Sequence, residues 1–268
     1  MNAFVAHFAF EFRTGVRNKM LLFLNYLFPL GLYLMLGFIL IGLNPFFQEV
    51  IIPGMVVIAA MAAYLFGIPE PLVGAREKGI LRSYKINGVP PSSILSIPSL
   101  TTGVHAVIVS AIITATAPVL FDAPLPVNWL GFLLTLVAIT SATAGMAVVM
   151  GVVSSNSRVV ILWSQVVFIP SMLLGGIMIP YGDLAQGVAR AAQLLPATQA
   201  MNAFRGLAMG EIADFDPWVS ITSLLACGIV GFGLALFLFR WDSNDTVRRG
   251  HPALGLLVLA PLALTLFF

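Results

Sequence analysis

Six long apolar runs divide this chain of 268 residues, and its charged residues lie almost entirely between them. The first run, Met20 to Gly42, holds no charged residue and at about 1.5 Å per helical residue can cross about 30 Å of hydrocarbon. Backbone groups inside a bilayer must bond to one another, so such a run folds as a helix. The sequence therefore predicts an all-α integral membrane protein with one transmembrane domain, residues 1–268. The predicted spans are residues 20–42, 51–67, 94–119, 129–154, 159–180 and 218–239.

Composition supports this class of protein. Hydrophobic residues make up 59% of the chain and charged residues only 9%. A mean hydropathy of +1.01 exceeds what a water-soluble core needs. The single cysteine, Cys227, excludes an internal disulfide and does not indicate a redox compartment.

The first 19 residues predict an amphipathic helix lying in the headgroup plane. On a helical projection one arc is apolar and the opposite side carries Arg13 and Arg17. The apolar arc consists of Phe4, Val5, Phe8, Phe12 and Val16. Alternatively, the segment is only a basic flank of the first span. No small-residue cleavage site follows it, so we expect the first span to stay in the mature protein.

The distribution of positive charge predicts the orientation. With the N-terminus in the cytoplasm, eleven of the 13 Lys and Arg residues face the cytoplasm, and only Arg190 and Arg205 lie outside. Cytoplasmic loops are enriched in Lys and Arg, so both ends of the six-span domain are expected inside. The eleven are Arg13, Arg17, Lys19, Arg76, Lys78, Arg82, Lys85, Arg158, Arg240, Arg248 and Arg249.

A polar island, residues 74–92 (GAREKGILRSYKINGVPPS), separates the second and third runs. The pattern predicts a surface helix from Glu77 to Tyr84, with one face on the membrane body and a basic face toward the cytoplasm. Asn87-Gly88 and Pro90-Pro91 end it. The expected body-facing residues are Ile80, Leu81 and Tyr84, and the basic ones are Lys78, Arg82 and Lys85.

Two further segments break the simple alternation of spans. Residues 181–211 are too polar to cross, and we expect two short helices on or dipping into the outer face, the first capped by Asp183 and the second, after Pro196, by Thr198. The apolar residues 253–268 number 16, about 24 Å of helix. They form either a tilted seventh span or an anchor on the cytoplasmic side.

Catalytic and metal-binding patterns are absent from the sequence. It has no HExxH pair, GxSxG elbow or phosphate-binding glycine loop, and its three histidines are scattered. No catalytic residue, metal site or nucleic-acid partner is therefore predicted. His105 is the one ionisable residue within a span besides the thiol, and is either a functional group or a neutral imidazole bonded to a neighbouring helix. Glu70 either pairs with Arg76 or stays at the wet interface.

Two stretches resemble the membrane permeases of ABC exporters of the ABC-2 type. The first reads Arg76-Glu77-Lys78-Gly79-Ile80-Leu81 and continues to Gly88-Val89-Pro90-Pro91. The second reads Gly175-Gly176-Ile177-Met178-Ile179-Pro180, then Leu194-Leu195-Pro196, then Ala203-Phe204-Arg205-Gly206-Leu207. Their order, spacing and placement on opposite membrane faces carry the resemblance, which covers nearly all of residues 1–240. The chain departs from the family pattern at Asn87, at Ala197 and in its apolar tail.

The resemblance implies that the N-terminal helix and the island helix rest on a separate cytoplasmic ATPase subunit, the latter as the coupling helix. It also implies an outer gate and a pairing of two permeases, identical or different, around a central pathway. The implied coupling residues are Arg76, Glu77, Lys78, Gly79, Leu81, Arg82 and Lys85. The implied gate residues are Gly175, Gly176, Pro180, Pro196 and Arg205. The implied pathway residues are Met55, Met61, Tyr64, Phe66, Phe168, Ser171 and Met172, for each of which ordinary helix packing is the alternative.

The resulting prediction is a multi-pass permease of the cytoplasmic (inner) membrane, in contact with membrane lipid, that exports a substrate. This chain would bind no cofactor, because the partner ATPase would use the ATP and Mg²⁺. Apolar pathway candidates favour a drug-like or lipid-like substrate, although the same residues occur in any membrane core. The rivals are an ion-coupled secondary transporter, disfavoured because no carboxylate lies at mid-membrane, and a non-transporting scaffold or intramembrane enzyme.

Overall fold

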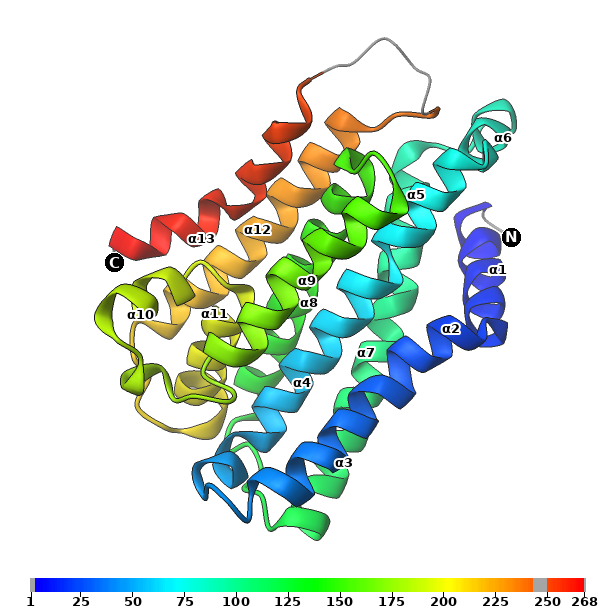
Figure 1. Cartoon of the computed structure of the whole chain (residues 1–268). Helices are drawn as coiled ribbons and strands as arrows, with labels where there is room; N and C mark the ends of the chain where they lie inside the picture. The colour runs from blue at the N-terminus through cyan, green and yellow to red at the C-terminus, as the bar shows by residue number, and fades with distance from the viewer. Residues whose placement is uncertain (1–2, 243–249, 268) are drawn as a thin grey trace.

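The computed structural model describes residues 3–242 and 250–267, and all regular structure in these ranges is helical. Within these ranges six helical stretches are long and apolar enough to cross a membrane, as the sequence predicts. They are Lys19–Leu40, Phe46–Glu77, Pro91–Phe121, Trp129–Val153, Ser157–Leu174 and Pro217–Leu238. Figure 1 shows them as one tilted bundle.

The helices follow one another in the order of the labels in Figure 1. The first half contains α1 (Ala3–Arg17), α2 (Lys19–Leu22), η1 (Phe23–Leu27), α3 (Phe28–Leu40), α4 (Phe46–Gly67), α5 (Pro69–Glu77), α6 (Ile80–Ile86) and α7 (Pro91–Phe121). The second half contains α8 (Trp129–Val153), α9 (Ser157–Leu174), η2 (Tyr181–Asp183), α10 (Gln186–Ala192), α11 (Pro196–Ala203), η3 (Phe204–Met209) and α12 (Pro217–Leu238). A last rod consists of η4 (Pro252–Leu259), α13 (Ala260–Leu264) and η5 (Thr265–Phe267).

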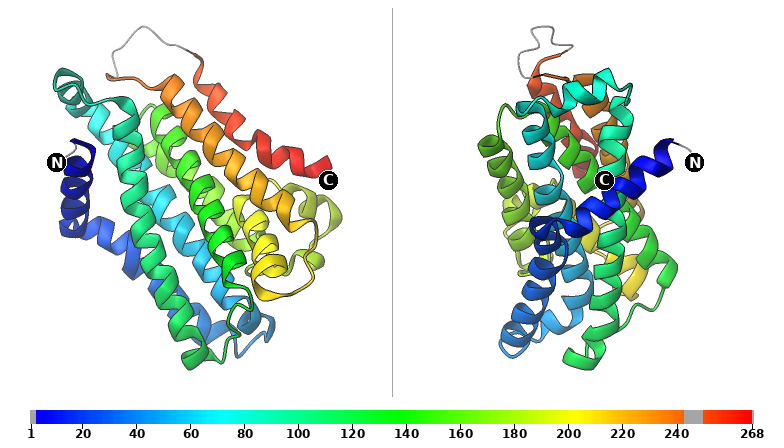
Figure 2. Two further views of the ribbon diagram at one scale, coloured as in Figure 1. Left: turned by 180° about the vertical axis from the view of Figure 1, so that it is seen from behind. Right: turned by 90° about the vertical axis from the view of Figure 1, so that its right-hand side faces the viewer.

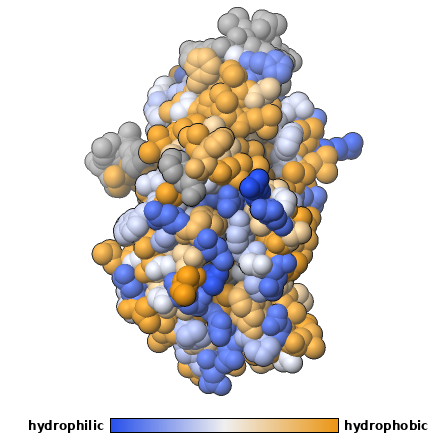
Figure 3. Space-filling view, turned by 90° about the vertical axis from the view of Figure 1, so that its left-hand side faces the viewer, coloured by the Kyte–Doolittle hydropathy of each residue, from blue (hydrophilic) through white to orange (hydrophobic). Residues whose placement is uncertain are grey.

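The bundle has two ends that matter for function. The α6 end holds the α5–α6 corner and the α8–α9 turn, and the α11 end holds α10, α11 and η3 (Figure 1). On the face of the molecule shown in Figure 3, apolar side chains dominate the upper half and polar ones gather in the lower half.

Helix α4 forms the centre of the bundle. Of the most apolar window of Phe46–Glu77, 89% is buried, against 22% for α9. The helices packed around α4 include α3, α7, α8, α9 and α11. Small and branched apolar residues on every side of a helix are typical of a buried position, and residues 50–65 of α4 have this pattern.

Helices α8 and α12 approach each other through glycines. A Cβ placed on Gly231 would lie 2.6 Å from the carbonyl carbon of Gly145, and one placed on Gly145 would lie 2.7 Å from the carbonyl oxygen of Gly228. Small residues let backbones pack this closely, which stabilises helix pairs inside a bilayer. This pair has the most extensive contact between elements of the described chain.

The N-terminal helix α1 is separate from the first span. Asn18 caps α2, since its side-chain oxygen accepts hydrogen bonds from the backbone N–H groups of Met20 and Leu21. Figure 2 shows α1 crossing the bundle obliquely, and it contacts α7. Phe8 and Phe12 are partly buried, whereas Val5 and Val16 of the predicted apolar arc stay exposed. Its place in the headgroup plane stays a prediction, because the structure contains no membrane.

Several predicted boundaries differ from the structure, among them those of the first, second and fifth spans. The first span ends at Leu40 rather than at residue 42, and the second begins at Phe46 rather than at residue 51. The fifth span ends at Leu174, six residues before Pro180, because Gly176 has φ 81° and stops the helix.

The capping residues predicted for the two short helices between residues 181 and 211 were wrong. Asp183 lies in η2, and the first helix of the pair begins at Gln186 after Ala185. The second helix begins at Pro196, so Thr198 is inside it rather than at its cap. Proline fits the first helical position because its missing N–H would have no partner there.

The C-terminal rod lies along α12 and α8 (Figure 1). Near its start, a Cβ on Gly255 would meet Val149 and Val153 at 3.0 Å, at the α6 end of α8. Near its finish, Thr265 accepts a hydrogen bond from Gln199 of α11, 3.0 Å away. The rod thus extends from the α6 end to α11, and its crossing of the membrane as a seventh span stays a prediction. Part of it is 3₁₀-helix, with about 2 Å per residue, so it reaches farther than the same number of α-helical residues.

Candidate functional site

The corner between α5 and α6 carries the predicted coupling residues. It consists of two short helices joined at Gly79, whose φ is 71°, rather than of one helix from Glu77 to Tyr84. L-residues with a Cβ rarely adopt this φ, so glycine suits the joint. Gly88, with φ 72°, closes α6 before Pro90, and α7 begins at the next residue.

Helix α6 has an apolar anchor and a charged outer face. Leu81 is 2% exposed and packs with Leu72, Leu95 and Val148, whereas Tyr84 is partly buried. Ile80 is 42% exposed, contrary to the expected face, because it opens the helix directly after the left-handed Gly79. The exposed charged residues of the corner are Glu77, Lys78, Arg82 and Lys85.

Arg76 is buried, unlike the other charged residues of the corner. Its side chain is 3% exposed and donates hydrogen bonds to the carbonyl oxygens of Val152 at 2.8 Å, Gly151 at 3.3 Å and Ser154. These carbonyl groups lie at the C-terminal end of α8. A helix has unpaired hydrogen-bond acceptors and a partial negative charge at that end. Arg76 therefore ties α5 to α8 rather than facing solvent, and it does not pair with Glu70, whose carboxylate lies 3.4 Å from the Ser157 hydroxyl.

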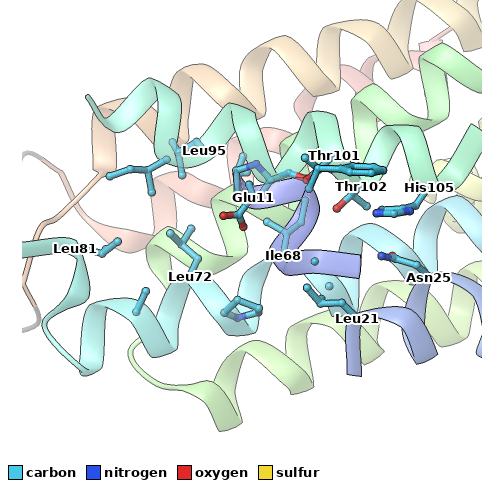
Figure 4. A pocket seen from close by; sticks show the side chains of 18 of the residues that line it. Glu11, Leu21, Asn25, Ile68, Leu72, Leu81, Leu95, Thr101, Thr102 and His105 are labelled. Carbon is cyan, nitrogen blue, oxygen red and sulfur yellow. The ribbon is translucent and has the colours of Figure 1, made fainter. Parts of the chain in front are cut away.

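A cavity of about 140 Å³ lies under α1, between η1, α4–α5, α6 and α7 (Figure 4). Its inner end contains His105, whose Nδ1 lies 2.7 Å from the hydroxyl of Tyr26 and whose ring stacks on Phe12 at 5.2 Å. His105 thus bonds to a neighbouring helix, as one of the two alternatives expected. Asn25 also lines the cavity and is 6% exposed, and its Oδ1 has no hydrogen-bond partner among the described residues.

The same cavity connects α1 to α6. Glu11 of α1 lines it together with Leu81 (Figure 4). Tyr84 of α6 also lines it. Burial raises the pKa of the Tyr84 hydroxyl, and the nearby Glu11 carboxylate raises that pKa further. A displacement of α6 would therefore displace α1 as well as the helices of the bundle.

At the α11 end, Gly175, Gly176 and Arg205 of the predicted gate residues lie in one cluster, since they line the same small void. A Cβ on Gly175 would lie 2.7 Å from the Cβ of Ala197, so α9 ends directly against α11. Pro196, at the start of α11, is buried, and Pro180 is partly buried. A void of only about 10 Å³ remains between Gly175, Gly176 and Arg205, too small for any substrate.

Arg205 has partners that the sequence analysis did not identify. Its Nε lies 2.9 Å from Glu211 and its Nη1 2.7 Å from Asp214. Asn202, one turn earlier, accepts hydrogen bonds from the backbone N–H groups of Asp214 and Phe215. The cluster of acidic residues shortly after Arg205 was the available signal. These contacts hold the loop before α12 against η3 and α11.

The pathway candidates on α4 lie inside the protomer. Met55, Met61 and Tyr64 are at most 3% exposed, and Phe66 is partly buried. On α9, Phe168 and Ser171 are buried and Met172 is partly buried. In one protomer these residues pack among helices, and the exposed face of α9 is formed by other residues. These include Ile161, Leu162, Val166, Ile169 and Leu173.

A comparison with family models finds a match to the family described as ABC-2 type transporter, over residues 2–209. The matched part contains the α5–α6 corner, α1 and the Gly175–Arg205 cluster, and stops before α12. No curated protein and no solved structure matches the chain.

Proposed function

The chain belongs to the ABC-2 type transporter family, and on that premise we propose that it exports its substrate with energy from ATP hydrolysed by a separate cytoplasmic subunit. Membership makes the chain a transport permease rather than an ion-coupled carrier or a scaffold. The export direction, the ATPase partner and a drug-like or lipid-like substrate are parts of the proposal.

One observation carries the proposal: a charged surface helix is connected rigidly to the centre of the bundle. The exposed Arg82 and Lys85 lie on α6, whose Leu81 is buried. The preceding helix is fixed to α8 through Arg76. A force applied to α6 would therefore move α5 and α8 together rather than bend a loose loop.

Helix α4 would transmit this movement to the other end. It continues into α5 as one helical stretch, Phe46–Glu77. Near its start, a Cβ on Gly54 would lie 2.9 Å from Ile177, within the Gly175–Pro180 stretch. Close-packed interiors transmit displacement because they have few voids. A tilt of α4 would thus press on the cluster proposed as the outer gate.

Docking of the ATPase subunit can be tested by reversing charge on α6. We expect Arg82→Glu with Lys85→Glu to weaken binding of the ATPase by about tenfold or more, because like charges placed across an interface repel. Folding should change little, since exposed charges contribute at most about 1 kcal/mol each. The measurement is co-purification and the Kd of the two subunits. Arg190→Glu, an exposed residue of α10, is the matched control, and equal binding by all variants would contradict the docking surface.

The proposed assembly contains two permeases. Helix α9 and the segment Lys19–Leu40 are only 22% and 28% buried, so their apolar faces are available to a second copy or to lipid. The pathway would then lie between protomers, bounded by α9, while the buried α4 would act behind it.

Orientation can be tested with cysteine labelling. Cys227 is 0% exposed and should not react, so single cysteines introduced at Asn156 and Gly187, both exposed, report their own sides. We expect an impermeant reagent to label position 156 only from the cytoplasm and position 187 only from outside. Labelling of position 187 from the cytoplasm would contradict the proposed orientation.

A further inference from the structure

A second and larger cavity, of about 570 Å³, lies between the end of α8, α9 and η4. Its volume falls in the range of about 300–1,000 Å³ that is usual for ligand sites. Most of its lining is apolar and includes one tryptophan. The lining includes Val149, Val153, Ser154, Trp163, Arg240 and Gly255.

The cavity is polar at one end only. Ser154, Ser155 and Arg240 line it at the α6 end, where α8 and α12 finish. From there the lining continues inward along α8 to Met146 and along α9 to Val167, about 12 Å at the rise of a helix, with apolar residues only. This gradient fits a ligand with a polar head at the membrane surface and an apolar tail in the hydrocarbon.

The polar end has hydrogen-bond donors available. Ser154 is 2% exposed, and its hydroxyl has no hydrogen-bond partner among the described residues. Arg240 is partly buried, and its positive charge acts on that of Arg76. Two guanidinium groups near one helix end repel each other, and an anion at Arg240 would offset that repulsion.

The wall formed by η4 is held in place by specific contacts. The thiol of Cys227 donates to the carbonyl oxygen of Val258, 3.2 Å away, and Gly255 packs against Val149 and Val153. Arg240 and η4 lie outside the residues that match the family model. The cavity therefore depends on a part of the chain that the family match does not cover.

We propose that this cavity holds one anionic phospholipid of the leaflet at the α6 end, with its phosphate at Arg240 and Ser154 and one acyl chain along α8 and α9. The positive charge and the hydroxyl select the head group, because arginine and hydroxyl donors bind phosphate oxygens strongly. The lipid is a resident ligand that fills the space between the bundle and the C-terminal rod, not the transported substrate.

The test is native mass spectrometry of the purified full chain after exchange into detergent containing equal phosphatidylglycerol and phosphatidylcholine. We expect one phosphatidylglycerol retained per chain, and about tenfold less in Arg240→Ala, because the charged hydrogen bonds are lost. Ala253→Trp, which fills the cavity, should reduce retention of both lipids. Arg158→Ala is the matched control, since Arg158 is an exposed cation at the same end that does not line the cavity.

The proposal would be overturned if the wild-type chain retained no lipid or if Arg240→Ala retained as much as the wild type. An equal loss in Arg158→Ala would also overturn it, because it would indicate only general attraction to basic residues. Gel filtration and thermal unfolding of each variant verify folding. If Ala253→Trp does not fold, Ala253→Leu provides a smaller filling, and unchanged retention in that variant would exclude the cavity as the binding site.

Discussion

Replacing Arg76 with Met should remove about 3 kcal/mol or more of stability and most of the folded protein from the membrane. The substitution leaves the carbonyl groups of Gly151, Val152 and Ser154 without the donor that they have now, in a buried place. Each buried acceptor left unpaired costs about 1–3 kcal/mol. Such a loss is a large share of a typical total stability of about 5–15 kcal/mol. The measurement is membrane abundance and the melting temperature in detergent.

Arg82→Met is the matched control for this prediction, because it deletes the same cation from an exposed position of the same corner. The stability of Arg76→Lys should lie between those of Arg76→Met and Arg82→Met. Lysine keeps the charge but lacks the planar guanidinium group that reaches several carbonyls. If Arg76→Met and Arg82→Met have the same abundance and melting temperature, Arg76 does not fix α5 to α8.

Replacing Gly231 with Val should separate α8 from α12 and destabilise the bundle by about 3 kcal/mol or more. The first added carbon would lie 2.6–2.7 Å from backbone atoms of Gly145, which cannot turn away as a side chain could. The measurement is the fraction of monodisperse protein on gel filtration together with its melting temperature.

Gly233 offers a control on the same helix, because a Cβ there meets nothing within 4 Å. Gly233→Val should change stability by less than about 1 kcal/mol. Equal effects of the two substitutions would mean that helix propensity, rather than the close contact with α8, limits stability.

The six spans could be predicted from sequence because each depends only on local composition. A run such as Met20–Gly42 has one viable structure in a bilayer, whatever surrounds it. The basic face of α6 was also predictable, since Arg82 and Lys85 recur with helical spacing. Helix ends were less predictable where they depend on tertiary contacts, as at Gly175, which meets Ala197 of a later helix.

The role of Arg76 could not be predicted from the sequence. In the linear pattern it belongs to the same charged island as Lys78, and its partners lie 75–78 residues away at the end of α8. The tyrosine partner of His105 is 79 residues distant. Such pairings follow from how helices pack, which composition and periodicity do not encode residue by residue.

The cavity beside the C-terminal rod was missed for the same reason. Residues 253–268 read as a marginal apolar segment, and nothing local indicates that η4 packs so close to α8. Only the combination of α8, α9, Arg240 and η4 creates the space. A chain with the same local patterns and a different rod would lack it.

The claim that α6 couples ATP hydrolysis to the bundle is tested most directly by the ATPase activity of the reconstituted complex in vesicles. We predict that the wild-type permease stimulates hydrolysis by its ATPase subunit and that the stimulation rises with substrate. Arg82→Glu with Lys85→Glu should abolish the stimulation while leaving the melting temperature and the basal hydrolysis of the isolated ATPase unchanged. Full stimulation by the doubly reversed, normally folded permease would contradict the claim.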